Sequence, residues 1–173
     1  KIFLRDRQTG TTTLAVKALD GSEPNNLCWA PVISANGQFV TYEAMATNLI
    51  ANETLWISDV YVTELQTGVT TRVSVGSDGT QATGDSYGPS ISADGRYVVF
   101  ETLSSIILDS GALNGTYDVA IHDRQTGTTS LVSRSASGLS GNGASFNCAV
   151  SGDGRYVAFA SWATDLVADD TNG

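Results

Sequence analysis

Short runs of apolar and β-branched residues recur along the whole chain, and turns rich in glycine and polar residues separate them. Almost continuously apolar runs are typical of strands that are buried on both faces; they lie at 39–43, 97–101 and 156–160. Runs that alternate apolar residues with threonine are typical of half-buried strands; they lie at 12–16, 70–75 and 129–133. No segment combines helical periodicity with helix caps, so the pattern predicts an all-β fold.

Two turn motifs recur with one period and divide the chain into three copies of one unit. Asn-Gly or Asp-Gly turns begin at Ser34, Ser92 and Ser151, which are 58 and then 59 residues apart. Gln-Thr-Gly turns end at Gly10, Gly68 and Gly127, with the same two spacings. Two independent markers with the same period indicate tandem repeats. We therefore interpret 1–173 as a single module whose repeats of about 58 residues cover approximately 1–58, 59–117 and 118–173.

Each repeat predicts four short antiparallel strands, A to D. Strands A and B enclose the Asn-Gly or Asp-Gly turn, and strands C and D enclose the Gln-Thr-Gly turn. The chain opens with C and D at 1–16, holds complete units at 29–75 and 87–133, and ends with A and B at 146–161. Four-stranded antiparallel units in tandem are typical of the blades of a β-propeller.

One stretch resembles a known family. The segment 89–100 reads Pro-x-Ile-Ser-x-Asp-Gly-Arg-Tyr-Val-x-Phe, which resembles the WD-repeat-like propeller repeats of the TolB type. Asp-Val-Tyr-Val at 59–62 and Gln-Thr-Gly at 66–68 are similar to the later part of those repeats. The family's proline in Ser-Pro-Asp-Gly is replaced in all three copies, by Ala35, Ala93 and Gly152. The resemblance implies a β-propeller and a protein-interaction role in the cell envelope, and hence a secreted or periplasmic, bacterial-like protein.

Three blades are too few for a closed ring, because propellers typically have four to eight. Two alternatives follow. In a head-to-tail homodimer, strands A and B of one chain pair with C and D of the next, which gives six blades and removes the open sheet edges. In the other alternative, the chain is a segment of a longer repeat protein.

Composition excludes several classes of function. The 173 residues hold 9 basic and 18 acidic side chains, a formal net charge of −9, so we expect no nucleic acid partner. No apolar run is long enough for a membrane span. The sequence offers no nucleophile–base–acid set and no phosphate-binding glycine loop, so we expect a chain that is not an enzyme. Two cysteines, Cys28 and Cys148, are expected to be buried free thiols, and the lone His122 a surface residue.

The acidic residues concentrate in the long connections from B to C and from D to A. Connections of this length are functional or packed loops, and their charge would attract a basic surface. The preferred function is therefore a non-catalytic exported binding or scaffold module with a protein partner. The candidate partner-binding residues are Glu53, Asp78, Asp85, Asp109 and Asp170.

Two other functions stay open. One is a structural repeat segment of a larger extracellular surface protein or assembly. The other is a glycan-binding or glycoside-cleaving propeller, with Trp56 and Trp162 as ligand-binding aromatics. Clustered hard oxygen ligands also suit Ca²⁺, and no other cofactor is expected. The candidate calcium ligands are Asp165, Asp169, Asp170 and Asn172.

Overall fold

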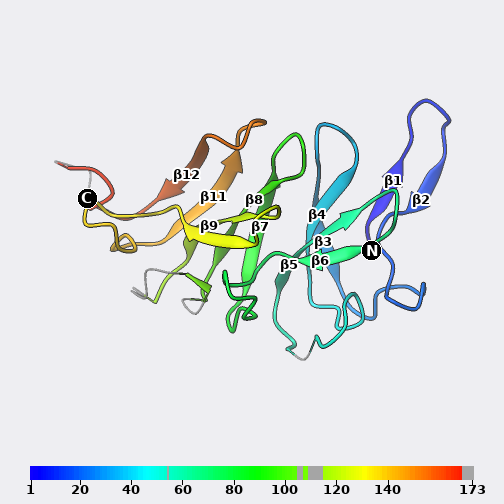
Figure 1. The fold of residues 1–173 in the computed structure, drawn as a ribbon, viewed down its shortest axis with the longest axis horizontal. Helices are drawn as coiled ribbons and strands as arrows, with labels where there is room; N and C mark the ends of the chain where they lie inside the picture. Colours follow the sequence, from blue (N-terminus) through cyan, green and yellow to red (C-terminus); the bar gives the residue numbers. More distant parts are fainter. Residues whose placement is uncertain (54, 105–106, 109–114, 169–173) are drawn as a thin grey trace.

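The structure is a computed structural model that describes residues 1–53, 55–104, 107–108 and 115–168. Four antiparallel sheets stand side by side in an open row, with the two termini at opposite ends (Figure 1). The strands are β1 (Phe3–Arg5), β2 (Thr12–Leu14), β3 (Cys28–Ile33), β4 (Phe39–Ala44), β5 (Asp59–Glu64), β6 (Thr70–Arg72), β7 (Ser86–Ile91), β8 (Tyr97–Thr102), β9 (Asp118–Asp123), β10 (Thr128–Leu131), β11 (Ser145–Val150) and β12 (Val157–Ser161). The predicted all-β fold is confirmed.

The sheets follow the predicted strand order. Strands β3 to β6 form the first blade and β7 to β10 the second blade, each in sequential order. Strands β1 and β2 form a two-stranded sheet, which we call the N-terminal half-blade, and β11 and β12 form the C-terminal half-blade. The two complete blades share one register, since Phe39 lies opposite Glu64 in the first and Tyr97 opposite Asp123 in the second.

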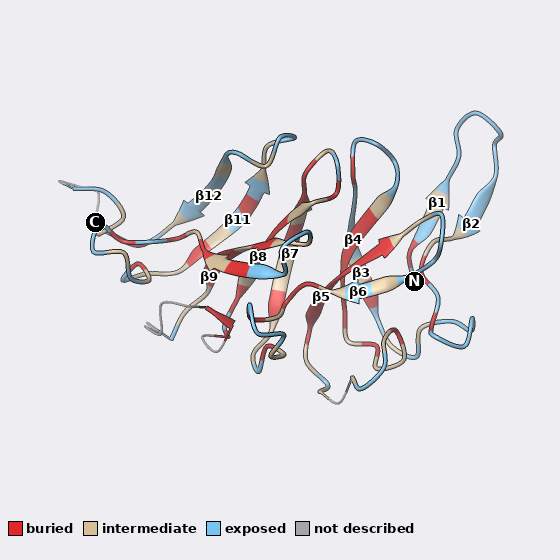
Figure 2. Cartoon of the chain, viewed as in Figure 1, coloured by how far each residue is buried: buried red, intermediate tan, exposed pale blue. Residues whose placement is uncertain are grey.

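Apolar packing is concentrated in the two complete blades. Burial is greatest along β4, β5, β8 and β9, whereas the half-blades at both ends of the row are largely exposed (Figure 2). Tyr42, Tyr61 and Phe100 are fully buried large side chains. The largest apolar cluster lies between the first and second blades, where β5 and β6 face β7 and β8. Blade-on-blade contact therefore supplies most of the core.

The strands β3, β7 and β11, which we call the inner strands, each carry a bulge. In β7 and β11 this bulge contacts the sheet before it. Ala30, Gly88 and Asn147 occupy equivalent positions and all have a positive φ, at 48°, 58° and 55°. The bulge turns the amide of Gly88 toward the first blade, where it donates to Glu43 Oε1 at 2.8 Å. The amide of Asn147 donates in the same way to Glu101 Oε1 at 2.7 Å. We call these two contacts the bulge clamps.

A second link joins the short A-to-B turn of one sheet to the A-to-B turn of the next sheet. The ring of Phe39 in the first blade lies against Gly95 in the turn of the second blade, and Tyr97 lies in the same way against Gly154. The main chain continues this link, because the Ala93 amide donates to the Gly152 carbonyl at 2.9 Å. These glycines are needed because a Cβ at Gly95 would lie 2.1 Å from Phe39 Cδ2.

The two expectations for single residues have different outcomes. Both cysteines are buried free thiols, as predicted. The prediction that His122 is a surface residue is wrong, because its side chain is 6% exposed and its Nδ1 pairs with Thr129 Oγ1 at 2.8 Å. The physical reason is the connection after β6, which lies over β10 and binds Thr129 through Val75 and Ser77. Burial lowers the pKa of His122.

Gly95→Ala tests the turn contact between blades. We expect a loss in the free energy of unfolding of about 2–5 kcal/mol, because the positive φ costs about 1–2 kcal/mol and the displaced Phe39 ring about 1–3 kcal/mol. Gly127→Ala is the matched control, since Gly127 has a similar φ of 74° and open space where the Cβ would lie. Equal losses in urea unfolding for the two variants would contradict the contact.

Candidate functional site

The connections between strands gather on two opposite sides of the row of blades. Short turns join strands A to B on one side, which we call the turn side (Figure 1). The short turns from C to D belong to the same side, since the Leu65 amide donates to the Gln38 carbonyl at 2.8 Å and the Arg124 amide to the Arg96 carbonyl at 2.9 Å. The long connections from β2 to β3, β4 to β5, β6 to β7 and β10 to β11 lie on the other side, which we call the loop side.

Charge divides unequally between the two sides. The turn side, with the strand ends beside it, carries equal numbers of acids and arginines, so its formal charge cancels. The acids are Asp6, Glu64, Asp94, Asp123 and Asp153, and the arginines are Arg5, Arg7, Arg96, Arg124 and Arg155. The whole formal charge of −9 therefore falls on the rest of the chain.

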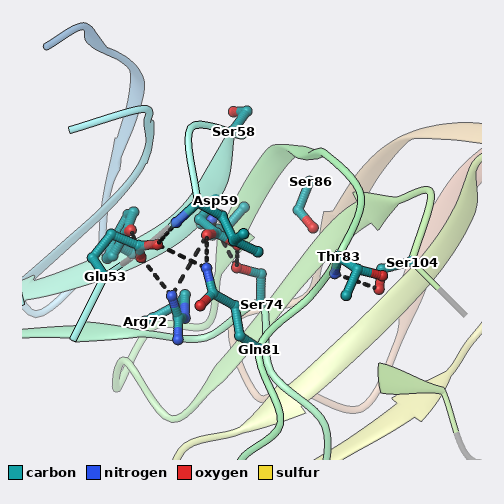
Figure 3. A network of polar contacts seen from close by, with 12 residues as sticks. Glu53, Ser58, Asp59, Arg72, Ser74, Gln81, Thr83, Ser86 and Ser104 are labelled. Atoms are coloured by element: carbon teal, nitrogen blue, oxygen red, sulfur yellow. Dashed lines mark hydrogen bonds and ion pairs between the residues drawn. The ribbon is translucent and has the colours of Figure 1, made fainter. Parts of the chain in front are cut away.

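Part of this charge is buried in an ion cluster where the loop side meets the first blade (Figure 3). Glu53 comes from the connection after β4, Asp59 begins β5 and Arg72 ends β6. Gln81 reaches the cluster from the connection before β7. The side chains of both carboxylates are 1% exposed and that of Arg72 is 12% exposed. We call this group the ion cluster.

Each carboxylate in the ion cluster has several partners. Glu53 accepts hydrogen bonds from Arg72, from the Tyr61 hydroxyl at 2.7 Å and from Gln81 Nε2 at 2.8 Å. Asp59 accepts from Ser74 Oγ at 2.6 Å and from Gln81 Nε2 at 3.2 Å, and lies 3.7 Å from Arg72 Nη1. Among the described residues, Arg72 Nε is a buried donor without an acceptor.

Arg72 lies beside two buried carboxylates, and the pKa values of these carboxylates shift in opposite directions. Burial raises the pKa of Asp59 to about 6, against the opposing effects of Ser74 and Arg72. Burial also acts to raise the pKa of Glu53, but hydrogen bonds from Tyr61 and Gln81 and the charge of Arg72 outweigh it, and the pKa is lowered. Glu53 therefore holds the negative charge that Arg72 needs, and Asp59 takes up a proton more readily than an ordinary aspartate.

The second blade repeats the aspartate but not the arginine. Asp118 begins β9 and accepts from Ser133 Oγ at 2.7 Å and from Ser140 Oγ. Ser74 and Ser133 occupy equivalent positions. Each hydroxyl also accepts a hydrogen bond from the backbone amide of the residue after the aspartate. Burial raises the pKa of Asp118. The aspartate thus fastens the start of strand C to the end of strand D in both blades, as expected for a capping residue.

The ion cluster corrects one sequence expectation. Glu53 was expected to face solvent as a partner-binding residue, but it is enclosed by Tyr61, Arg72 and Gln81. An ion pair buried to this degree is costly to break, because the remaining charge loses its partner. The arrangement fastens two long connections to the first blade, and neither carboxylate is open to a substrate in this conformation.

Exposed acids lie in a turn that recurs within the connections from D to A. Gly21, Gly79 and Gly138 have φ of 82°, 82° and 84°, and each closes the same short backbone loop. Asp20 and Asp78 precede the first two of these glycines and are exposed. Hydrogen bonds from Ser22 and Thr80 lower the pKa of these two aspartates. The larger effect comes from the hydroxyl of each partner and the smaller one from its backbone amide. We call Asp20 and Asp78 the acidic turn pair.

The other predicted site residues are dispersed. Asp85 is half-buried and accepts the Ser58 amide at 2.8 Å, and Asp165 accepts the Asn142 amide at 2.9 Å. Within the described ranges, no group of three or more His, Cys, Asp or Glu side chains could hold a metal ion. The remaining predicted ligands and contacts lie outside the described residues: Asp109, Asp169, Asp170 and Asn172.

The two candidate aromatic residues are both exposed. Trp56 is 65% exposed on the connection after β4, and Trp162, which follows β12, is 75% exposed. Trp162 packs edge-on against Phe146, with ring centroids 5.0 Å apart. The second blade stands between their sheets in the row, so the structure does not bring the two side chains into one site (Figure 1).

Two features of the loop side were not predicted from the sequence. The recurring turn could have been found, because Gly21, Gly79 and Gly138 repeat at 58 and 59 residues like the other motifs. The partners of Glu53 are harder to predict, since Arg72 and Gln81 are 19 and 28 residues away in the chain. The available signal was a charged arginine at the end of a threonine-rich strand.

The fold is similar to that of known proteins, although the sequence is not. No model of a protein family and no curated protein matches the chain. In three dimensions, 92% of the chain is similar to 31% of TolB from Acinetobacter baumannii, with a TM-score of 0.53 and 18% identity. The same share is similar to 13% of the tricorn protease, with a TM-score of 0.56 and 16% identity, and to 22% of a prolyl endopeptidase, with a TM-score of 0.55 and 16% identity.

These likenesses show the class of fold. The chain spans less than a third of the length of each of the three proteins. Its four-stranded antiparallel sheets are blades of a β-propeller similar to that of TolB. In the part of the chain that is described, no helix is long and apolar enough to cross a membrane.

Asp59→Asn tests the electrostatics of the ion cluster. The folded pKa of Asp59, about 6, lies above its ordinary value of 3.8, so its contribution to stability is full below about pH 4 and is lost as pH rises through about 6. Relative to the wild type, the Asn variant should therefore gain roughly 2–3 kcal/mol in the free energy of unfolding between pH 4 and pH 7.

The measurement is urea unfolding of both proteins across that pH range. Asp78→Asn is the control, because the pKa of Asp78 is lowered and its removal should change the pH dependence only below about pH 4. A difference between wild type and Asp59→Asn that does not vary with pH would contradict the raised pKa.

Proposed function

We propose that this chain is a non-catalytic, exported propeller module that binds a protein partner of basic surface through its loop side. The observation that carries the proposal is the uneven division of charge. The formal charges of the turn side cancel, and the formal charge of −9 belongs to the rest of the chain. A surface with one sign of charge accelerates encounter with a partner of opposite sign and sets its orientation.

The acidic turn pair supplies exposed acids without an ion-pair partner in the described residues. Asp20 and Asp78 stand at equivalent positions on successive connections, and neither makes an ion pair in the described residues. Their hydrogen bonds to Ser22 and Thr80 fix the carboxylates within the turn while leaving them in solvent. A repeated carboxylate on a rigid turn offers a partner two anchoring points with little loss of conformational freedom.

The non-catalytic part of the proposal rests on the ion cluster. Glu53 and Asp59 share Arg72 and Gln81 as partners, and these partners enclose both carboxylates. Peptidases share this fold as well, so the fold does not decide between binding and catalysis. The resemblance of the repeats to the TolB type favours binding in the cell envelope, secreted or periplasmic.

Charge removal at the acidic turn pair tests the binding role. In the double variant Asp20→Asn, Asp78→Asn, the amide oxygen keeps the turn contacts while two charges disappear. We expect binding to a fluorescent lysine-rich peptide, measured by anisotropy at low salt, to weaken about two- to thirtyfold, because two exposed ion pairs contribute about 0.2–1 kcal/mol each.

The matched control adds the same charge to the turn side. Gln66→Lys with Gln125→Lys changes the net charge by the same amount at two exposed positions. If the control weakens binding as much as the Asn variant, net charge alone governs binding and the loop side has no special role. A wild-type chain that does not bind the peptide at all would also contradict the proposal.

A further inference from the structure

A cavity lies on the turn side where the two complete blades meet. Its volume is about 310 Å³, which is near the lower end of the range for small-ligand sites. Both blades beside it are complete four-stranded sheets. We call it the turn-side cavity, and its lining includes Phe39 from the first blade and Asp94, Gly95, Arg96 and Arg124 from the second.

The guanidinium of Arg124 in this cavity has no carboxylate partner among the described residues. Its Nη1 donates to the Gly95 carbonyl at 2.7 Å, and its Cζ lies 4.6 Å from the centroid of the Phe39 ring. A guanidinium has five N–H donors, so this hydrogen bond leaves most of them available. Solvent reaches them, since in the described residues the buried side-chain polar atoms without a partner are Ser58 Oγ and Arg72 Nε.

The environment of Arg124 compensates its charge only in part. The side chain is half-buried, and burial lowers its pKa although the charge of Glu64 acts in the opposite direction. A charge removed from water is costly unless it is paired. The Phe39 ring and the Gly95 carbonyl offset some of this cost through a cation–π contact and one hydrogen bond. An anion in the turn-side cavity would supply the countercharge that the chain itself does not.

The other charged side chains of the turn-side cavity already have partners. Arg96 binds both carboxylate oxygens of Asp123, at 2.9 Å and 2.7 Å, so these two charges cancel. Asp94 Oδ1 accepts the Ser92 hydroxyl at 2.6 Å and the Arg96 amide at 3.0 Å, and these hydrogen bonds lower the pKa of Asp94. Asp94 therefore stays negative at the exposed rim, and Arg124 is the cation that a ligand can reach.

Comparison of the two complete blades shows that the fold does not require this arginine. Leu65 occupies the equivalent position in the first blade, and the amides of Leu65 and Arg124 make the same main-chain contact. Arg96 is likewise replaced by Gln38 in the first blade. Of the two complete blades, only the second carries both arginines. The repeat therefore folds without them, and their presence beside a cavity favours a role in binding.

We propose that the turn-side cavity binds a carboxylate of an acidic peptide, with the Arg124 guanidinium as its charge partner. Parallel N–H donors of a guanidinium match the two oxygens of a carboxylate, and Arg96 with Asp123 shows this geometry on the same side. A phosphate group carries nearly two charges at neutral pH, more than one arginine balances beside Asp94. The site does not rest on the loop-side proposal, because its ligand has the opposite charge and lies on the opposite side.

A titration followed by nuclear magnetic resonance tests the site. The signals are the Arg124 Nε–H and the Gly95 amide, and the probe is the peptide acetyl-Ala-Glu-Ala-amide. Its matched control is acetyl-Ala-Gln-Ala-amide, which has the same shape without the charge. We expect saturable shifts of both signals, with binding of the Glu peptide about five- to tenfold tighter, because hydrogen bonds to charged groups are the stronger ones. Equal binding of the two peptides would overturn the proposal.

Two further probes identify the source of the anion. The peptide acetyl-Ala-Ala-Ala with a free C-terminus offers a main-chain carboxylate in place of a side-chain one. Tighter binding of this peptide than of the Glu peptide would assign the site to a chain end, and the reverse order would assign it to an acidic side chain. Inorganic phosphate that binds more tightly than both peptides would overturn the carboxylate assignment.

Arg124→Leu places the residue of the first blade at this position, so the fold should be preserved, which circular dichroism checks. In this variant the Glu peptide should no longer shift the Gly95 amide. Arg7→Leu is the matched control, because it removes the same charge at the equivalent, exposed position of the N-terminal half-blade and should leave binding intact. A Gly95 shift that persists in Arg124→Leu, or is lost equally in Arg7→Leu, would overturn the proposal. The comparison of peptides on the wild-type chain stands even if a variant does not fold.

Discussion

The contact between successive sheets is the constraint on which the rest of the structure depends. Each inner strand carries a residue with positive φ, and at Asn147 this costs about 1–2 kcal/mol that only surrounding contacts can offset. The bulge clamps provide that compensation, since Glu43 and Glu101 each bind an amide that its own strand has turned outward. Because the glutamate belongs to one blade and the amide to the next, each blade is fixed by its neighbour.

The two sides of the molecule differ in how they take part in this contact between sheets. On the turn side, blades approach so closely that Gly95 and Gly154 lie under aromatic rings, and balanced charges form ion pairs such as Arg96 with Asp123. On the loop side, long connections are fastened inward by Asp59 and Asp118, which leaves Asp20 and Asp78 in solvent. The turn side thus holds contacts between blades, and the loop side is the surface that we propose for a partner.

Local signals were sufficient to predict the strands. Apolar runs, Asn-Gly or Asp-Gly turns and the period of 58 and 59 residues predict the two complete sheets and the two-stranded sheets at the ends. The candidate site was harder, because its contacts join different repeats. Glu53 is enclosed by residues of two later segments, and His122 is covered by a connection from the preceding blade. Neither burial is visible in the residues beside them in the sequence.

Native-state hydrogen exchange tests the central claim most directly. The bulge clamps predict that the amides of Gly88 and Asn147 exchange slowly, whereas the amide of Ala30, to which no carboxylate of the described residues is bound, exchanges faster. Glu43→Ala should accelerate exchange at Gly88 far more than at Asn147. Equal exchange at all three bulge amides, or no change at Gly88 in that variant, would contradict the account in which each blade is held by its neighbour.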